Sequence, residues 1–259
     1  MRLDLFLTKN GFSESRNKAA ALINDGSVIV NGKRITKTSF NVQDSDIVEI
    51  ISNQKMYVAR SAAKLLTAID KFGLSFKDKT VVDLGASTGG FCEVMLENGA
   101  KRIYAVDIGT NQLHPKIKND PRVVNKENTN ARYVTAADFD SEIDIITCDL
   151  SFISLKNILG SAMCTLKQGG EFICLIKPQF EAGPGNIGKN GVVKDTSIHI
   201  KVIRDISEYA FSIGFEICDI VFSGLAGESG NREFLMYLKK SDTPVNLPSE
   251  KIINAVLGK

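Results

Sequence analysis

The sequence predicts an α/β protein in which a small α+β module precedes a doubly wound, mostly parallel sheet. Two observations lead to this class. From Thr80 onward, short apolar runs typical of buried strands alternate with segments of helical periodicity, the order that builds a parallel sheet covered on both faces. The first fifty residues combine two short helical segments with a hairpin signal, which indicates a separate unit. A length of 259 residues fits one or two domains.

The composition is that of an ordinary globular protein. Apolar residues make up 43% of the chain and charged residues 24%, which excludes disordered, collagen-like and coiled-coil chains. The longest uncharged apolar stretches, such as Phe172–Ile176, fall far short of the roughly 18 residues of a membrane helix. Asp4 stands where a signal peptide would begin its apolar region. We therefore expect a cytoplasmic protein with no membrane partner.

Residues that ligate metals are few. The chain has two histidines and five cysteines, with no CxxC spacing, so a tetrahedral zinc site is hard to build and we expect no metal. Most of the cysteines stand in apolar surroundings and are expected to behave as small buried hydrophobic residues. The net charge of +2 is too balanced to indicate nucleic-acid binding by itself, so that function has to be argued from local charge.

The first module is predicted to end at residue 51. A helix is predicted over residues 1–10 and another from Ser13 to Gly26, because apolar residues recur at helical spacing between an N-cap residue and a glycine. Asn31-Gly32 then separates two β-prone runs and predicts a hairpin, since both residues accept positive φ. A last strand that starts at Asp46 closes the module.

Basic residues occur at the helix starts and in the hairpin of this module. A solvated charged surface accounts for most such patterns, and RNA binding is the alternative. The linear pattern of Arg2-Leu3-Asp4, Ser15-Arg16 and residues 26–33 resembles the αL RNA-binding motif of a ribosomal small-subunit protein, pseudouridine synthases and some tRNA synthetases. The resemblance implies docking on folded RNA through shape and phosphate contacts. The residues expected to contact RNA are Arg2, Arg16, Lys18, Lys33 and Arg34, together with Arg60 beyond the module.

Residues 52–63 are predicted to link the module to the next domain. Between Lys55 and Lys79, six basic residues stand against two acidic ones. Such a local excess of positive charge is where a phosphate backbone could run.

The large domain is predicted from its alternating strands and helices, and is expected to span residues 64–240. Strands are predicted over residues 80–84, 102–106, 143–148, 171–176 and 215–221, and helices over 91–97, 155–166 and 197–212. Ligands of such sheets bind outside the carboxyl ends of the strands. Residues 241–259, with Pro244 and Pro248, are expected to form a loose extension that ends in a short helix, and no role is assigned to them.

A glycine-rich segment, Asp83–Phe91, joins the first strand of this domain to the helix that follows. Glycines let a backbone approach a ligand closely, although a tight turn without a ligand is the simpler alternative. The spacing differs from the dinucleotide fingerprint GxGxxG, which disfavours a nicotinamide cofactor. Asp107 ends the second strand, where an acid can accept hydrogen bonds from ribose hydroxyls.

Several long motifs between Tyr57 and Leu238 resemble those of FtsJ-type methyltransferases, which use S-adenosylmethionine. The motifs lie at residues 57–65, 83–91, 107–113, 148–154, 176–181 and 230–235. With the small module in front, their order is similar to that of the TlyA (hemolysin A) family of ribosomal RNA 2′-O-methyltransferases. The resemblance implies a Rossmann-like methyltransferase sheet with one antiparallel strand. It also implies an enzyme that methylates ribose 2′-hydroxyls, of cytidine, in ribosomal RNA of the small subunit, the large subunit or both.

The catalytic set of that family is Lys-Asp-Lys-Glu, and its counterparts here are Lys64, Asp149, Lys177 and Glu233. Asp149 and Lys177 each follow a predicted strand, at the rim where a doubly wound sheet binds its ligand. An ammonium group that is partly desolvated and close to another one has its pKa pushed below its ordinary value. Lys177 could then act as general base or orient the hydroxyl, with the two acids holding the lysines and Lys64 supplying positive charge. The alternative is a set of structural salt bridges.

The resemblance also implies where the cofactor lies. The methionine end is expected at the glycine-rich segment, the ribose at Asp107 and the adenine near Asn130, with residues 128–129 or Asp138 as alternatives. The residues expected to bind the cofactor are Asp83, Gly85, Ser87, Thr88, Gly89, Gly90, Phe91, Asp107 and Asn130.

Two features of the large domain leave its substrate fit open. Ala59, Ser61 and Pro115 depart from the family pattern, the first two of them close to Lys64. The glycine-rich loop over residues 181–191 is expected either to close over RNA or to be an ordinary surface loop.

Three other functions remain alternatives. A membrane-damaging cytolysin agrees with the historical name of the family, but the sequence contains neither a secretion signal nor a strongly amphipathic stretch. A non-catalytic assembly factor would bind ribosomes through the same RNA-binding module without methylating them. A nicotinamide oxidoreductase is disfavoured by the glycine spacing.

Overall fold

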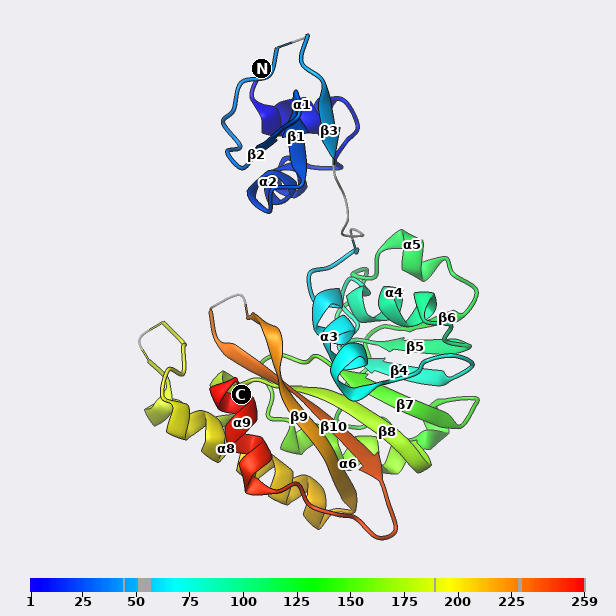
Figure 1. The fold of residues 1–259 in the computed structure, drawn as a ribbon. Helices are drawn as coiled ribbons and strands as arrows, with labels where there is room; N and C mark the ends of the chain where they lie inside the picture. The colour runs from blue at the N-terminus through cyan, green and yellow to red at the C-terminus, as the bar shows by residue number, and fades with distance from the viewer. Residues whose placement is uncertain (44, 51–56, 189, 228–229, 259) are drawn as a thin grey trace. The chain divides into compact units, whose positions relative to one another are not determined.

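The computed structural model describes residues 1–43, 45–50, 57–188, 190–227 and 230–258. The chain divides into two compact units, Met1–Met56 and Tyr57–Lys259, each with its own core (Figure 1). Residues 52–56 of the predicted linker lie outside the described residues.

The first unit is a two-helix, three-strand module. Its elements are α1 (Leu3–Lys9), α2 (Arg16–Asn24), β1 (Val28–Val30), β2 (Lys33–Ile35) and β3 (Val48–Ile50). The strands form an antiparallel sheet in the order β2-β1-β3. Asn31 and Gly32 both have positive φ, as the predicted tight hairpin requires. Both helices and the hairpin are therefore confirmed. The last strand starts two residues later than predicted, and its predicted last residue, Ile51, lies outside the described residues.

The second unit is built on a seven-stranded sheet in the order β6-β5-β4-β7-β8-β10-β9. Its strands are β4 (Thr80–Leu84), β5 (Arg102–Val106), β6 (Val123–Lys126), β7 (Ile143–Cys148), β8 (Leu166–Ile176), β9 (Phe215–Ala226) and β10 (Arg232–Lys240). Within the described residues, β10 is the one strand that runs opposite to all the others in the sheet. The predicted doubly wound sheet with one antiparallel strand is confirmed.

Helices cover both faces of this sheet (Figure 1). They are α3 (Ala62–Phe72), α4 (Gly90–Glu97), α5 (Pro115–Lys118), α6 (Lys156–Thr165), α7 (Pro178–Glu181), α8 (Thr196–Ser212) and α9 (Ser249–Leu257), with short 3₁₀ turns at Ala136–Asp138 and Pro184–Asn186. Buried residues of α3, α4 and α5 pack on one face, and those of α6, α8 and α9 on the other. Alternate residues of each strand point to opposite faces of the sheet. Because helices cover both faces, both sets of side chains are buried and apolar.

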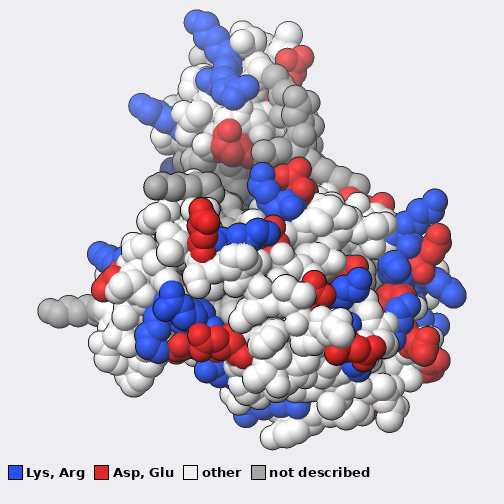
Figure 2. Space-filling view, turned by 60° about the horizontal axis from the view of Figure 1, so that its bottom comes forward, with Lys and Arg blue, Asp and Glu red and all other residues white. Residues whose placement is uncertain are grey.

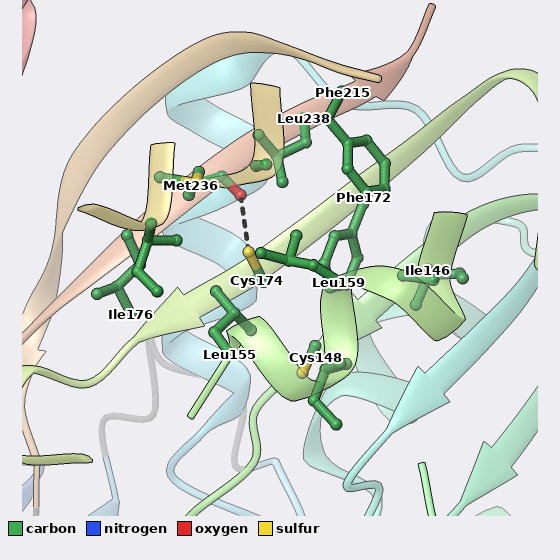
Figure 3. Packing of buried hydrophobic residues seen from close by; sticks show 14 of the residues in the cluster. Ile146, Cys148, Leu155, Leu159, Phe172, Cys174, Ile176, Phe215, Met236 and Leu238 are labelled. Carbon is green, nitrogen blue, oxygen red and sulfur yellow. Dashed lines mark hydrogen bonds between the residues drawn. The ribbon is translucent and has the colours of Figure 1, made fainter. Parts of the chain in front are cut away.

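Strand β8 illustrates this two-sided burial. Phe172, Cys174 and Ile176 pack with α6 and β10 on one face (Figure 3), while Ile173 and Leu175 enter the cluster on the other face. The Cys174 thiol donates a long hydrogen bond of 3.9 Å to the carbonyl of Met236 in β10. Burial raises the pKa of this thiol, which behaves as the small hydrophobic residue that its surroundings predicted.

The remaining cysteines are also free thiols. Cys92 and Cys148 are buried, Cys218 is half-buried and Cys164 is exposed. Among the described residues, no group of three histidine, cysteine or acidic side chains converges as metal ligands would. In the same part of the chain, no helix combines the length and the apolar character needed to cross a membrane.

The predicted looseness of the C-terminal tail is wrong. The short helix expected there is α9, and its residues Ile252 and Val256 are buried against α8 and β9. Arg232 of β10 adds a hydrogen bond of 2.7 Å to the Val256 carbonyl. The reason is the spacing of Ile252, Ala255 and Val256, which places their side chains on one face of the helix.

Candidate active site at the carboxyl edge of the sheet

Four charged side chains meet at the edge of the sheet where the parallel strands end. Asp149 directly follows β7, and Lys177 directly follows β8. Glu233 is the second residue of β10, and because this strand runs in the opposite direction, its start lies at the same edge. Lys64 reaches this edge from the first turn of α3. We call these four residues the charged tetrad.

The tetrad forms a chain of alternating charges. The Nζ of Lys64 lies 2.7 Å from Oε2 of Glu233 and 3.2 Å from Oδ2 of Asp149. The Nζ of Lys177 lies 2.7 Å from Oδ1 of Asp149 and donates a hydrogen bond of 2.9 Å to Oγ of Ser151. Asp149 therefore separates the two lysines and contacts both.

The tetrad is largely removed from water. Its side chains are between 4% and 13% exposed, so an uncompensated charge would be costly there. The positive charges of the two lysines balance the negative charges of Asp149 and Glu233. Burial alone would lower the pKa of Lys64, but the attraction of Asp149 and Glu233 outweighs it and raises this pKa above its ordinary value. Closeness to another ammonium does not govern Lys64, because a carboxylate lies between the two lysines.

Gly227 lies against the carboxylate of Glu233. A Cβ atom added to Gly227 would lie 2.4 Å from Oε1 of Glu233, closer than non-bonded atoms approach. The backbone before β10 therefore passes directly over this carboxylate. A larger residue at position 227 would displace one corner of the tetrad.

The glycine-rich segment lies beside the tetrad, between β4 and α4. Gly85 and Gly89 have φ values of +85° and +92°, and a Cβ at either position would come within 2.9 Å of a leucine side chain. A Cβ on Gly90 would lie 2.5 Å from Oγ of Ser61 and 2.9 Å from the Cβ of Ala59. The segment before Lys64 thus packs directly on the glycine-rich segment, so the two positions that depart from the family pattern bear on its geometry.

Asp107 orients this segment from the end of β5. One carboxylate oxygen accepts a hydrogen bond of 2.8 Å from the backbone amide of Ser87, and the other accepts one of 2.8 Å from the amide of Gly109. Ser87 and Thr88 are exposed. Ile108, which follows Asp107, exposes 68% of its surface.

Two residues expected to bind the cofactor are placed inside the protein. Asp83 is 1% exposed, and its carboxylate accepts hydrogen bonds from the Thr147 hydroxyl at 2.8 Å and the Cys92 thiol at 3.2 Å. Burial raises the pKa of Asp83 to about 6. Phe91 is buried in the core under α4. Both side chains at the ends of the glycine-rich segment therefore point into the protein.

The region expected to meet the adenine lies after β6. Asn130 is half-buried, and its side-chain oxygen accepts a hydrogen bond of 3.1 Å from the amide of Arg132. Asp138 is occupied at a helix start, where it accepts hydrogen bonds from the backbone and side chain of Thr135. Asn130 thus leaves its amide group available, whereas Asp138 serves as a cap.

Most of the basic residues expected to contact RNA lie in the first unit. Arg2 and Arg16 both bind the carboxylate of Asp4, Arg2 through two nitrogens at 3.0 and 3.1 Å and Arg16 at 2.9 Å. These hydrogen bonds hold the pKa of Asp4 down at about 2, the one from Arg2 contributing most. Lys18 pairs with Glu14 of its own helix start.

The other predicted RNA contacts are placed separately. Lys33 and Arg34 are exposed on the hairpin, where the Arg34 side chain lies against Gly26. Arg60 belongs to the second unit and donates a hydrogen bond of 2.7 Å to the carbonyl of Ala226. On the face drawn in Figure 2, basic and acidic side chains are interspersed, in keeping with the small net charge.

Sequence reasoning missed two residues beside the tetrad. Ser151 accepts the hydrogen bond from Lys177, and Phe152 exposes 89% of its surface at a φ of +63°. Few non-glycine residues adopt this conformation, and an aromatic one is an outlier. The Phe152 ring lies 5.1 Å from that of Phe180. Both residues belong to the motif at residues 148–154, but the amino-acid sequence of this motif does not indicate its backbone conformation.

A cleft of about 370 Å³ lies at the opposite edge of the sheet, among the starts of the parallel strands. Thr80, Arg102, Asp144 and Lys167 contribute to its walls. Acids and bases are mixed there, and Lys167 pairs with Asp144. Because ligands of doubly wound sheets bind at the carboxyl ends of the strands, we place the functional site at the tetrad.

Comparisons with known families cover nearly the whole chain. A family model described as FtsJ-like methyltransferase matches residues 57–240, and one described as S4 domain matches residues 1–48.

Curated proteins are similar along most of their length. The chain is 39% identical to Hemolysin A of Brachyspira hyodysenteriae, over 92% of this chain and 99% of that protein. It is 36% identical to the 16S/23S rRNA (cytidine-2'-O)-methyltransferase TlyA of Mycobacterium tuberculosis, over 92% and 89%. It is 35% identical to the 23S rRNA (cytidine-2'-O)-methyltransferase TlyA of Campylobacter jejuni, over 93% and 100%.

Solved structures share the fold. A candidate hemolysin from Streptococcus thermophilus is 40% identical, with a TM-score of 0.79, and the match covers 100% of this chain and 94% of that one. An S-adenosylmethionine-dependent methyltransferase from Mesorhizobium loti has a TM-score of 0.52 at 14% identity, over 68% of this chain and 97% of that one, and shows the fold alone.

Proposed function

The chain belongs to the FtsJ-like methyltransferase family of TlyA-type proteins with an S4 domain, and from this premise we propose that it methylates ribosomal RNA. The proposed reaction is transfer of a methyl group from S-adenosylmethionine to the 2′-hydroxyl of a cytidine ribose. The relatives from Mycobacterium tuberculosis and Campylobacter jejuni are named for this activity. The observation that carries the proposal is the buried, charge-balanced tetrad at the carboxyl edge of a methyltransferase sheet.

The residues near the tetrad fit this cofactor. When bound, S-adenosylmethionine supplies a methyl group activated by a sulfonium centre. Gly85 and Gly89 keep the backbone free of side chains where it turns into α4, and the free amides at the start of that helix suit a carboxylate. Each oxygen of Asp107 keeps a lone pair for a ribose hydroxyl. Exposed Ile108 offers an apolar surface to a flat base.

The two lysines have different partners, and we assign them different roles. Lys64 contacts two carboxylates, which favour its ammonium form, so it supplies fixed positive charge and holds Asp149 and Glu233 in place. Lys177 contacts one carboxylate and the hydroxyl of Ser151. In its neutral form, Lys177 accepts the proton that the 2′-hydroxyl loses as its oxygen bonds to the methyl carbon, while the bond from that carbon to the sulfonium sulfur breaks and leaves a neutral thioether. Asp149 then pairs with the resulting ammonium.

Phe152 supports a nucleotide substrate. An aromatic side chain held outward next to the tetrad gives a base a surface on which to stack. Unstacked RNA bases commonly stack on aromatic side chains, and such stacking would hold the substrate nucleotide at the site. Phe180, in contact with Phe152, extends the same surface.

The first unit supplies an anchor for folded RNA. Asp4 fixes the guanidiniums of Arg2 and Arg16, which remain about half exposed, so both are oriented before RNA binds. Planar guanidiniums suit phosphate contacts, which position a protein on RNA without reading its sequence. Because the proposed substrate is ribosomal RNA, we propose that the protein acts in the cytoplasm.

Incubation with labelled S-adenosylmethionine and RNA tests the function. The full chain is given ribosomal subunits or naked ribosomal RNA from cells lacking the enzyme, and the methylated nucleotides are mapped. We expect label on a cytidine 2′-oxygen. Absence of label from every RNA and subunit, together with bound ribosomes, would favour the assembly-factor alternative. Lysis of red cells by a Lys177→Ala variant would favour the cytolysin.

A further inference from the structure

Two motif segments at the active-site edge are joined at three points. The first segment is Asp149–Leu155, after β7, and the second is Lys177–Glu181, after β8 and including α7. Lys177 bonds to Asp149 and Ser151 at one end. The rings of Phe152 and Phe180 are in contact in the middle. We call the two joined segments the active-site bracket.

Glu181 makes the third connection, at the far end of the bracket. Its Oε1 accepts a hydrogen bond of 2.6 Å from the backbone amide of Leu155, and its Oε2 accepts one of 2.7 Å from the Ser154 hydroxyl. Leu155 is the N-cap residue of α6, so this carboxylate lies at a helix N-terminus, where negative charge is favoured. Both carboxylate oxygens of Glu181 therefore accept a hydrogen bond from the first segment.

A small cavity lies between the two segments of the bracket. Its volume is about 10 Å³, and it is lined by Leu150 and Ile153 of the first segment among others, and by Lys177 and Glu181 of the second segment. Phe152, in the middle of the first segment, has the unfavourable φ of +63°. An outlier of this kind persists only where its surroundings hold it. The polar connections at the two ends of the bracket flank Phe152 and tie its segment to the next one, so they can hold this conformation.

We propose that Glu181 is a positioning residue for methyl transfer, which fixes the Asp149–Leu155 segment so that Asp149 and Ser151 orient Lys177. The inference rests on the proposed function and deepens it, since the same segment presents Phe152 to the substrate. Glu181 acts through Ser154 and Leu155. Its burial also raises its pKa.

Substitutions separate positioning from folding. In Glu181→Ala both hydrogen bonds are lost, and we expect the rate constant for methyl transfer to fall about tenfold to a hundredfold, as misplacement of reacting groups does. In Glu181→Gln the amide oxygen can still accept from Leu155 while the amide nitrogen donates to Ser154, so most of the rate should return. Ser154→Ala removes one connection and should have an intermediate effect. Glu208→Ala, on the exposed face of α8, is the matched control.

Steady-state kinetics and hydrogen exchange are measured on the full chain. We expect Glu181→Ala to lower kcat with the KM for S-adenosylmethionine within about twofold, and to speed amide exchange across residues 149–155. A Glu181→Ala enzyme with the wild-type rate would overturn the inference. Equal loss of activity in Glu181→Ala and Glu181→Gln would also overturn it, because the hydrogen bonds would then not matter.

Failure of the proposed function has a different signature. A wild-type chain that transfers no methyl group to any RNA would contradict the function. The exchange measurement would still decide whether Glu181 fixes the segment, since it needs no substrate. If Glu181→Ala does not fold, Ser154→Ala carries the same kinetic and exchange tests.

Discussion

At the scale of single residues, Asp149 separates the two lysines of the tetrad, and Glu233 accounts for the difference between them. Asp149 lies 3.2 Å from Lys64 and 2.7 Å from Lys177, so neither lysine faces the other directly. Besides Asp149, Lys64 contacts a second carboxylate, that of Glu233. Besides Asp149, the partner described for Lys177 is the neutral hydroxyl of Ser151. This asymmetry is the physical basis for assigning permanent charge to Lys64 and proton transfer to Lys177.

Asp83 makes the stability of the protein depend on pH. Burial raises its pKa from 3.8 to about 6, so between these values the folded state binds more protons than the unfolded state. Stability should therefore be highest below pH 3.8 as far as this group is concerned, and decrease by about 3 kcal/mol as the pH rises through 6. Asp83→Asn removes the ionisation. In urea unfolding, the free energy of unfolding of the variant relative to that of the wild type should increase between pH 4.5 and 7.

The direction of this change is the test. Asn can still accept the hydrogen bond from Thr147, so the polar site remains occupied in the variant. A difference between variant and wild type that is constant across this pH range would contradict the assignment.

At the scale of elements, tight packing of the segment before α3 on the glycine-rich segment predicts sensitivity at Gly90. A Cβ there would meet Ser61 and Ala59 at 2.5 and 2.9 Å, so Gly90→Ala should destabilise the fold by about 1–3 kcal/mol and weaken cofactor binding. Gly160→Ala in α6, where a Cβ meets nothing within 4 Å, is the control and should stabilise by about 0.5–1 kcal/mol. Calorimetry and thermal unfolding measure both. Equal effects of the two substitutions would contradict the packing argument.

The C-terminal helix α9 should contribute to the core of the second unit. Ile252 is 3% exposed and Ile253 is 37% exposed, so the two adjacent residues form a matched pair. Ile252→Ala should lower the free energy of unfolding by about 2–5 kcal/mol, as for other buried isoleucines, and Ile253→Ala by much less. Denaturant unfolding gives both values. If Ile252→Ala leaves the free energy of unfolding unchanged, the result would support the loose C-terminal extension predicted from the sequence.

The sequence predicted most elements of the fold because their patterns are local. The hairpin followed from Asn31-Gly32, and the parallel strands from short apolar runs between helical segments. The family resemblance implied one antiparallel strand, but its position at residues 232–240 was not predicted, because the apolar residues 234–238 form a continuous run that periodicity alone does not distinguish from a buried helix. The packing of the tail was missed because two prolines precede α9.

The site was predictable only through the family resemblance. Lys64 and Asp149 lie 85 residues apart, and no local rule relates such positions. Family motifs named the four members of the tetrad, but not Glu181, whose importance lies in two hydrogen bonds to another segment. The inward burial of Asp83 was also not readable from its motif, because it depends on Thr147 of a neighbouring strand.

At the scale of the whole molecule, the affinity for RNA should depend on a few lysine and arginine side chains, since the net charge of the protein is only +2. Lys33 is exposed on the hairpin of the first unit. If it contacts a phosphate, Lys33→Ala should reduce the slope of log affinity against log salt by about 0.7–0.9. Lys201→Ala, in a surface pair of α8, should leave the slope unchanged. Filter binding across salt concentrations measures this, and equal slopes for all three proteins would exclude Lys33 from the interface.

Methyl transfer by Lys177→Ala is the most direct test of the account as a whole. Single-turnover transfer of labelled methyl groups to ribosomal RNA is measured for this variant and the wild type, with cofactor affinity measured by calorimetry. Loss of a general base should slow transfer by about 10²–10⁴ while the cofactor dissociation constant stays within about twofold. A variant that binds cofactor and methylates RNA at the wild-type rate would show that the tetrad is a set of structural salt bridges.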